Sequence, residues 1–126
     1  MPRNVPALPG IEASTLPFSQ IVEANGFVFL AGQVGNRPGE HGAVPGGIVG
    51  ETRQMLDNVG RLLEAVGLDC RDVVKTTVYL RDFTDFAAMN DVYREYFPTE
   101  PPTRATVGVT ALASDFRVEI EALAAR

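Results

Sequence analysis

The sequence predicts an α+β fold in which a mixed sheet of five to six strands carries two helices on one of its faces. Three observations predict this fold: short runs of alternating apolar residues, two longer segments with apolar residues at helical spacing, and an order along the chain in which these strands and helices interleave. The chain has 126 residues, 45% of them hydrophobic, which suits a single domain over residues 1–126.

The first part of the chain predicts an extended arm followed by a β-hairpin. Residues 1–16 contain three prolines and no hydrophobic periodicity, which is typical of an arm lying over a domain. Asn25-Gly26 supplies two residues that tolerate the positive φ angles of a type I′ turn, between strands expected at 19–24 and 27–34. Apolar residues fall on both sides of the second strand, so we expect both of its faces to be buried.

A glycine-rich loop then leads to the first helix. Residues 35–50 hold six glycines and two prolines, which indicates a loop with room for a short strand at 43–44. Helical spacing of apolar residues follows, and Gly67 is expected to end the helix in the left-handed conformation; the stripe comprises Met55, Leu56, Val59, Leu62, Leu63 and Val66. Glu51, Asp57 and Glu64 do not share one helix face, so we expect them to be solvated rather than to bind a metal.

The second half of the chain predicts one more helix between strands. A strand is expected at 73–81, and a helix opens near Asp82 or Thr84, either of which can cap its first turn. The apolar stripe of this helix ends before Pro98 and comprises Phe86, Met89, Tyr93, Tyr96 and Phe97. Two further strands, at 104–110 and 116–124, complete the sheet.

The last two strands carry the charged residues of greatest interest. Alternation places Arg104 and Thr106 on one side of the first strand and apolar residues on the other side, which we expect to face the core. Glu119 and Glu121 lie opposite the apolar side of the last strand. We therefore expect Arg104 and these glutamates on the non-core face, either as ion pairs or as a small anion site in which arginine holds a carboxylate bidentately.

Two helices cover only one face of a sheet of this size. The second face would expose apolar residues to water, and apolar patches of several hundred Å² are rare on soluble monomers. We therefore predict a homo-oligomer in which another copy of the chain covers this face.

Composition and charge exclude several classes of protein. The net charge of −5 argues against binding to nucleic acid through bulk charge. No segment approaches the ~20 apolar residues that cross a bilayer, and the N-terminus lacks a secretory signal pattern, so we expect a cytoplasmic protein without a membrane partner. His41 and Cys70 are the only histidine and cysteine, so we expect no metal site, a solvated His41 and a Cys70 that packs as a small hydrophobe.

Six motifs in order along nearly the whole chain resemble the Rid family of reactive intermediate deaminases, also called YjgF-like or RidA proteins. They are Leu16-Pro17-Phe18-Ser19-Gln20, Phe29-Leu30-Ala31-Gly32-Gln33, Asp72-Val73-Val74-Lys75-Thr76-Thr77-Val78-Tyr79-Leu80, Asn90-Asp91-Val92-Tyr93-Arg94-Glu95-Tyr96-Phe97, Pro102-Thr103-Arg104-Ala105-Thr106-Val107 and Val118-Glu119-Ile120-Glu121-Ala122-Leu123-Ala124. The resemblance implies a chorismate-mutase-like subunit assembled as a homotrimer, with clefts between neighbouring subunits.

The resemblance also implies an activity. Archetypal members hydrolyse enamine and imine acids such as 2-aminoacrylate to ammonia and a 2-keto acid, without a metal or organic cofactor. Such chemistry needs a small carboxylate to be fixed and protons to be moved, which are tasks of orientation and general acid–base catalysis.

The site residues are carried over position by position. Arg104 aligns with the family's carboxylate-binding arginine and Glu119 with the glutamate that handles the water or its proton. Phe18, Ala31, Gly32, Asn90 and Thr106 align with residues that line the cleft. Phe18, Ala31 and Thr106 stand where archetypes have tyrosine, serine and often cysteine, so the site is less polar than the archetype's.

Three readings of this site stay open. The leading one is an enamine or imine deaminase. A second is a non-catalytic trimeric module that binds 2-keto or other small carboxylic acids, which the missing hydroxyls at Phe18 and Ala31 motivate. A third is a pathway-specific relative that acts on another enamine. Ribonuclease activity, attached to some relatives, fits poorly with the acidic composition.

Overall fold

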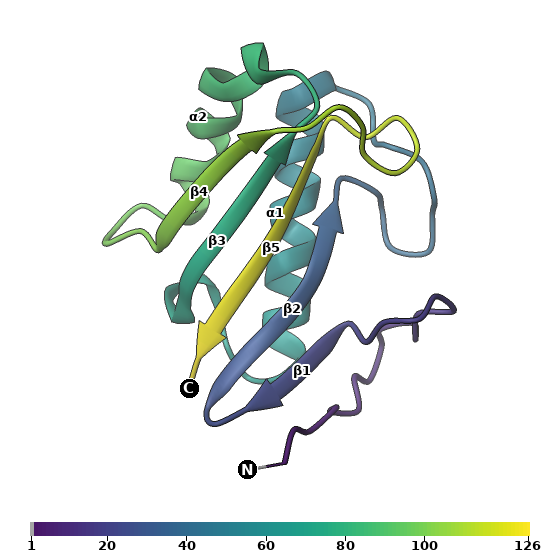
Figure 1. Ribbon diagram of the computed structural model, residues 1–126, viewed down its shortest axis with the longest axis vertical. Coiled ribbons are helices and arrows are strands. Elements are labelled where there is room, and N and C mark those ends of the chain that lie inside the picture. Colours follow the sequence, from purple (N-terminus) through teal and green to yellow (C-terminus); the bar gives the residue numbers. More distant parts are fainter. Residues whose placement is uncertain (1) are drawn as a thin grey trace.

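The computed structural model describes residues 2–126; Met1, the first residue of the predicted arm, lies outside them. These residues form a five-stranded mixed sheet and two α-helices (Figure 1). The strand order is β1-β2-β5-β3-β4, and β3 pairs with β4 in parallel while the other neighbours are antiparallel. In chain order the elements are β1 (Ile21–Ala24), β2 (Phe27–Val34), α1 (Gly47–Ala65), the 3₁₀ turn η1 (Cys70–Asp72), β3 (Val73–Leu80), the 3₁₀ turn η2 (Phe83–Asp85), α2 (Phe86–Tyr96), β4 (Thr103–Gly108) and β5 (Val118–Ala125).

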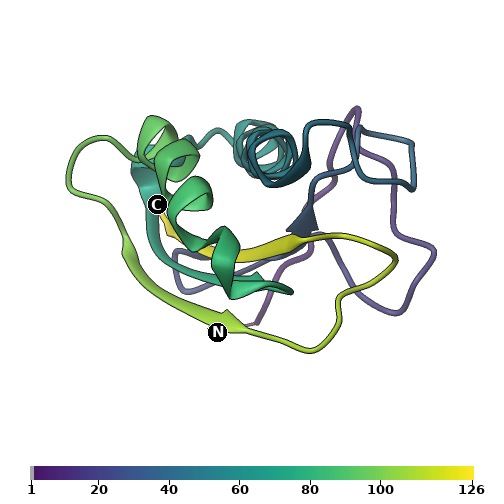
Figure 2. The same cartoon turned by 90° about the horizontal axis from the view of Figure 1, so that it is seen from above.

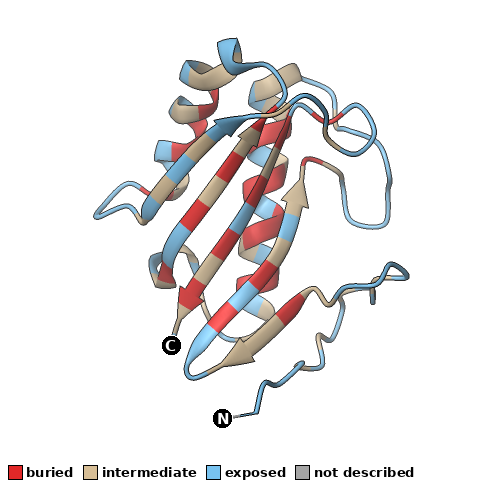
Figure 3. Cartoon of the chain, viewed as in Figure 1, coloured by how far each residue is buried: buried red, intermediate tan, exposed pale blue. Residues whose placement is uncertain are grey.

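Both helices pack on the same face of the sheet, as the sequence predicts (Figure 2). The other face is open, and burial alternates along the central strands between the helix face and this open face (Figure 3). The prediction that both faces of β2 are buried is wrong for the isolated chain. Val28 is fully buried beneath α1, whereas Phe27 and Phe29 are 44% and 46% exposed on the open face, where no element of the chain covers them.

The β1–β2 hairpin forms as predicted. Asn25 and Gly26 have φ angles of 52° and 80°, the positive values that a type I′ turn requires. Further along β2 the pairing with β5 shifts register between Leu30 and Gln33, which indicates a β-bulge. The bulge contains Ala31 and Gly32, so two of the predicted site residues lie where the strand is locally distorted.

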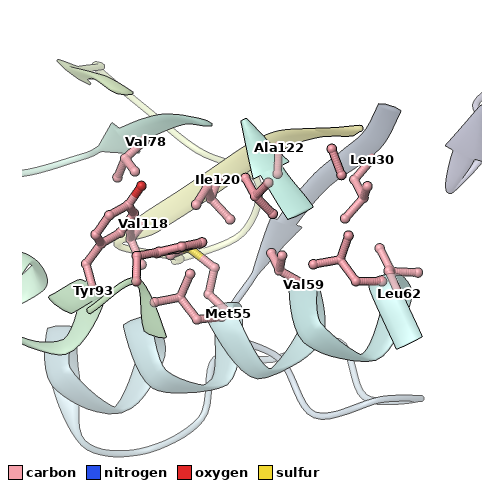
Figure 4. Close-up of a cluster of buried hydrophobic side chains, with 14 of the residues drawn as sticks. Leu30, Met55, Val59, Leu62, Val78, Tyr93, Val118, Ile120 and Ala122 are labelled. Carbon is pink, nitrogen blue, oxygen red and sulfur yellow. The ribbon is translucent and has the colours of Figure 1, made fainter. Parts of the chain in front are cut away.

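The helix α1 packs its buried face, which includes Met55 and Leu63, against the strands that supply the rest of the core. Its C-terminus is a Schellman motif: Gly67 has φ 78° and donates to the carbonyl of Glu64, while Leu68 donates to that of Leu63. Figure 4 shows the core between α1, α2 and the sheet, where full burial of side chains such as Met55 contributes about 1.5–3 kcal/mol each.

The second helix begins less directly than the sequence predicts. Asp82 accepts the backbone N–H of Thr84 and caps the turn η2, and only then does α2 begin at Phe86. The helix ends at Tyr96, before Pro98, and buries Met89, Val92 and Tyr93. This placement brings α2 over the outer strands of the sheet, next to β4 (Figure 1).

The segments outside the sheet are tied down by short backbone contacts. Asn4 and Glu23 exchange two backbone hydrogen bonds of 2.8 Å, so the N-terminal segment runs beside β1. The short strand expected at 43–44 is reduced to an isolated bridge between Asn36 and Ala43. Within residues 2–126, no helix has the length and apolar character needed to span a membrane.

Candidate functional site

Arg104, Asn90 and Thr106 lie together at the edge of the sheet, on the face covered by the helices, and are called here the arginine cluster. Arg104 pairs with Thr76 and Thr106 with Val78, both of which are buried under the helices. Because paired residues of neighbouring strands point to the same side, Arg104 and Thr106 face α2. The prediction that Arg104 lies on the non-core face, with the apolar side of its strand toward the core, is therefore wrong.

The physical reason is that α2 offers an aromatic surface to the guanidinium. The Arg104 guanidinium carbon lies 4.6 Å from the centroid of the Tyr93 ring and 5.7 Å from that of Phe86. Val107, on the other side of β4, is instead 39% exposed on the open face. The edge strand thus places its cation against aromatic rings and leaves its apolar side without cover in the single chain.

The ring beneath Arg104 is itself fixed. The Tyr93 hydroxyl and the Thr76 hydroxyl form a buried hydrogen bond of 2.8 Å. Burial raises the pKa of Tyr93, against the opposing effects of the Thr76 hydrogen bond and the Arg104 charge, so the ring stays neutral. Tyr93 belongs to the predicted core stripe, but sequence reasoning missed its second task as the platform of Arg104. The sequence carries one signal of this second role: Asn90 and Tyr93 lie about one helical turn apart, so their side chains share a face of α2.

The arginine cluster is chemically unsatisfied. Among residues 2–126, no carboxylate lies within ion-pair distance of Arg104. Asn90 Oδ1 and Thr106 Oγ1 are buried without a hydrogen-bond partner. A hollow of about 240 Å³ adjoins Asn90, Tyr93 and Arg104. Two buried polar atoms without a hydrogen-bond partner, beside a cation without a carboxylate partner among residues 2–126, suit a small ligand that carries a carboxylate.

Glu119, Gly32, Ala31 and Phe18 form a second group, called here the glutamate cluster. Glu119 lies opposite Val34 on β2 and Tyr79 on β3, and its carboxylate lies directly against the Cα of Gly32. All four members line a broad hollow of about 1090 Å³ between the N-terminal segment, β2 and the loop after it. This group faces the open side of the sheet, as the sequence predicts for Glu119.

The environment of Glu119 favours its protonated form. Burial raises the pKa of Glu119 above the ordinary glutamate value, and the neighbouring charge of Glu121 acts in the same direction. Glu121 in turn accepts a short hydrogen bond from the Tyr79 hydroxyl. A carboxyl group with a raised pKa is suited to transfer protons near neutral pH.

The bulge that holds Ala31 and Gly32 is fixed by a glutamine. The side-chain amide of Gln33 donates to the carbonyls of Ala31 and Gly32, at 3.1 and 3.2 Å, and to the Gln20 side chain at 3.3 Å. Gln20 and Gln33 close the first two quoted motifs, but their role in shaping the bulge was missed because alternation does not predict bulges.

The two clusters lie on opposite faces of the sheet. Arg104 and Thr106 point toward the helices, whereas Glu119 points away from them, with β3 between the two strands. A single chain therefore does not bring the predicted catalytic pair together. His41 is exposed in its loop, at the wall of the hollow that the glutamate cluster also lines. Cys70 is half-buried as the first residue of η1 and belongs to neither cluster.

Comparison with known proteins decides the family. The family model described as Endoribonuclease L-PSP matches residues 11–126. The 2-iminobutanoate/2-iminopropanoate deaminase of Capra hircus is 47% identical over 108 residues, covering 86% of this chain and 79% of that protein. The chain belongs to the Rid family. This agrees with the resemblance carried by its six motifs.

Solved structures agree with the Rid assignment. A protein of the Rid family from Yersinia pestis superimposes with a TM-score of 0.89 at 31% identity, covering 99% of this chain and 100% of that one. TdcF of E. coli, crystallised with bound serine, superimposes with a TM-score of 0.83 at 34% identity, covering 92% and 93% of the two chains. This Rid chain therefore has the fold of its relatives over nearly its whole length.

Proposed function

We propose that this Rid protein is an imine deaminase that hydrolyses 2-aminoacrylate-type intermediates to 2-keto acids and ammonia. The observation that carries the proposal is the Arg104 guanidinium, which is stacked on Tyr93, has no ion-pair partner within residues 2–126 and adjoins a hollow of about 240 Å³. The deaminase name of a relative 47% identical to the chain supports the same activity.

We also propose that the chain works as a homotrimer in which the arginine cluster of one copy meets the glutamate cluster of the next. Two facts support this arrangement: the clusters lie on opposite faces of one sheet, and the open face exposes apolar side chains such as Phe27 and Phe29. Each interface then completes one site, so the trimer has as many sites as chains.

The chemistry of the proposed site balances with water as the only co-reactant. Arg104 holds the substrate carboxylate in a bidentate manner, with Thr106 and Asn90 beside it. Protonated Glu119 supplies a proton to C3 of the enamine, which gives the iminium ion and leaves Glu119 as a carboxylate that can accept a proton from water. Water then adds to the imine carbon, Glu119 moves its protons, and the C–N bond breaks as nitrogen leaves with the electron pair as ammonia. The carbon retains the oxygen of water as the keto group. The imine carbon is electrophilic already, so this path needs no metal or organic cofactor.

The first experiment tests the activity and the role of Arg104. An amino-acid oxidase generates the imine in situ, and keto-acid release is followed with and without the protein. We expect acceleration by the wild type, its loss in Arg104→Ala, and unchanged rates in the control Arg71→Ala, whose side chain is 91% exposed. Equal rates for wild type and Arg104→Ala would contradict the proposal.

The second experiment tests the shared site. Arg104→Ala and Glu119→Gln are each expected to be inactive, and the two variants are then unfolded together and refolded at equal concentrations. If each site takes Arg104 from one chain and Glu119 from its neighbour, random assembly restores about a quarter of the wild-type activity. A site built within one chain restores none.

A second candidate function is binding of small carboxylic acids without turnover. The side chains of Phe18 and Ala31 offer no hydroxyl to the glutamate cluster, and this difference from the archetype motivates the second candidate. Calorimetric titration with a 2-keto acid, together with the absence of keto-acid release in the coupled assay, would identify a binding module. An activity confined to a different enamine would instead identify a pathway-specific relative.

The name of the matching family model raises ribonuclease activity as a third outcome. We propose that nucleic acid is not a partner, because the chain has a net charge of −5 and Arg104 adjoins a hollow of only about 240 Å³. RNA cleavage by purified wild type that disappears in Arg104→Ala would contradict this view.

A further inference from the structure

The side chain of Glu51 on α1 is one of the few buried charges of the chain. The sequence predicts a solvated surface for it, together with Asp57 and Glu64, but Glu51 is only 3% exposed, so that prediction is wrong for this residue. Its carboxylate points from α1 toward the start of β5. Burying an ionised carboxylate is costly unless it gains strong partners, so its contacts indicate what it does.

Glu51 holds the backbone just before β5. Its Oε1 accepts the N–H of Arg117 at 2.8 Å, and its Oε2 lies 3.6 Å from Nε of the same arginine. The carbonyl of Arg117 accepts from the N–H of Arg81, which follows β3. The backbone of Arg117 is therefore fixed between α1 and β3, and Glu119 lies only two residues further along.

The same helix also fixes the end of β2. Gly35 packs against the backbone of Glu51 so closely that a Cβ atom on Gly35 would lie 2.6 Å from the Glu51 carbonyl oxygen. Two helical turns along α1, the amide of Asn58 donates to the carbonyls of Val34 and Asn36, each at 2.9 Å. Val34 is the residue of β2 that pairs with Glu119.

These contacts meet where the glutamate cluster is built. Glu119 reaches its position against Gly32 only if β2 and β5 hold the shifted register that follows the bulge. Glu51 fixes the β5 side of this register through the hydrogen bond that its carboxyl oxygen accepts from the Arg117 N–H. Asn58 fixes the β2 side.

We propose that Glu51 is a positioning residue that orients Glu119 through the Arg117 backbone. This inference rests on the proposed role of Glu119 in proton transfer. It requires an acceptor oxygen at position 51, and it makes no use of the Glu51 charge.

Two substitutions at position 51 separate positioning from general stability. Glu51→Met keeps the length and volume of the side chain but cannot accept the Arg117 N–H. This variant leaves the Arg117 N–H without its acceptor, a loss smaller than the stability of a typical domain, so it is expected to fold. Glu51→Gln keeps an acceptor oxygen and serves as the conservative rescue. Glu64→Ala removes an exposed carboxylate from the same helix and is the matched control.

Turnover of the in situ imine gives the first readout. Glu51→Met should lower kcat on the order of tenfold or more, because small displacements of a catalytic group are costly. The KM should stay within about twofold, because the arginine cluster is untouched. Glu51→Gln and Glu64→Ala should keep kcat within about threefold of wild type. A folded Glu51→Met protein with wild-type kcat would overturn the proposal.

A second readout does not depend on turnover. The chemical shift of the Glu119 carboxyl carbon is followed by NMR as a function of pH. The titratable groups beside it are Glu121 on its own strand and Tyr79 on β3. The neighbouring residues of β2, Ala31, Gly32 and Gln33, carry no titratable group. In Glu51→Met the midpoint should fall toward the ordinary glutamate value as the carboxyl gains solvent. In Glu51→Gln it should stay unchanged.

The two readouts distinguish this inference from the proposed function. Absence of turnover in the wild type, with the Glu119 midpoint moved by Glu51→Met, would leave the positioning role standing and refute only the deaminase. If Glu51→Met does not fold, the hydrogen-exchange rate of the Arg117 amide in the wild type tests the positioning role instead. Protection comparable to that within β5 supports the hydrogen bond to Glu51, and exchange at the rate of an unstructured peptide overturns it.

Discussion

Gly32→Ala tests the contact between the bulge and Glu119 with the smallest available perturbation. A Cβ atom at position 32 would lie 3.1 Å from Cδ of Glu119 and closer still to Oε2. Ordinary contacts need about 3.5 Å, so the carboxylate has to move by about 1 Å. Misplacement of a catalytic group by about 1 Å lowers activity on the order of a hundredfold.

The same substitution should have little effect on stability. The side chain of Glu119 can turn aside, and alanine lowers the entropy of the unfolded chain, so the free energy of unfolding should change by no more than about 1 kcal/mol. The control is Gly60→Ala on α1, where the added methyl meets nothing within 4 Å. It should raise stability by about 0.5–1 kcal/mol and leave turnover unchanged. Wild-type keto-acid release by Gly32→Ala, with both variants folded, would refute the reasoning.

Three further substitutions test the remaining features. Tyr93→Phe leaves the hydroxyl of Thr76 buried and unpaired, and should lower the free energy of unfolding in urea by about 1–3 kcal/mol. The ring still supports Arg104, so kcat should be retained. A large loss of kcat would show that the Tyr93 hydroxyl itself takes part in the reaction. Burial raises the pKa of Glu119, so the ionised carboxylate destabilises the fold at pH values above that pKa. Glu119→Gln removes this charge and should therefore raise the melting temperature at pH 7.5. A rise in melting temperature that is equally large below the ordinary glutamate pKa would contradict this explanation. Phe29→Asp places a charge on the open face and should reduce the oligomer to a smaller species in light scattering, with an unchanged far-UV spectrum; an unchanged mass would exclude this face from the interface.

The parts of the fold that the sequence predicts well are those with local causes. The Asn25-Gly26 turn depends on the φ preferences of two residues, and the end of α1 depends on the conformational freedom of Gly67. The bounds predicted for β2 agree with the structure because a turn and a glycine limit the strand on both sides. Each of these features is decided within a few residues, so one sequence suffices.

The side of β4 that faces the core depends on residues outside the strand itself. Alternation shows that Arg104 and Thr106 share a face, and the structure confirms this, but alternation does not tell which face the helices cover. On a central strand, the apolar side is the one that normally faces the core. On an edge strand next to an aromatic helix, a guanidinium can lie over Tyr93 and still reach solvent.

The burial of Glu51 could have been predicted by comparing its position with the apolar residues of its helix rather than with Asp57 and Glu64. Its spacing from Asp57 and Glu64 indicates only that the three carboxylates do not share one face of the helix. Its relation to Met55 is different, because the two lie four residues apart and so point to the same side of α1. An acidic residue on the apolar stripe of a helix predicts a buried partner, here the Arg117 amide.

The placement of the two clusters gives an argument for association that the sequence does not contain. Coverage of the sheet by two helices predicts only that something packs on the open face. The structure adds that Arg104 and Glu119, a carboxyl group whose pKa is raised by burial, lie on opposite sides of that sheet. No side-chain movement within one chain brings them together, because β3 and its neighbours separate them. If Arg104 and Glu119 act on one substrate, the reaction therefore requires two chains, and the oligomer is part of the catalytic site rather than only a means of covering apolar surface.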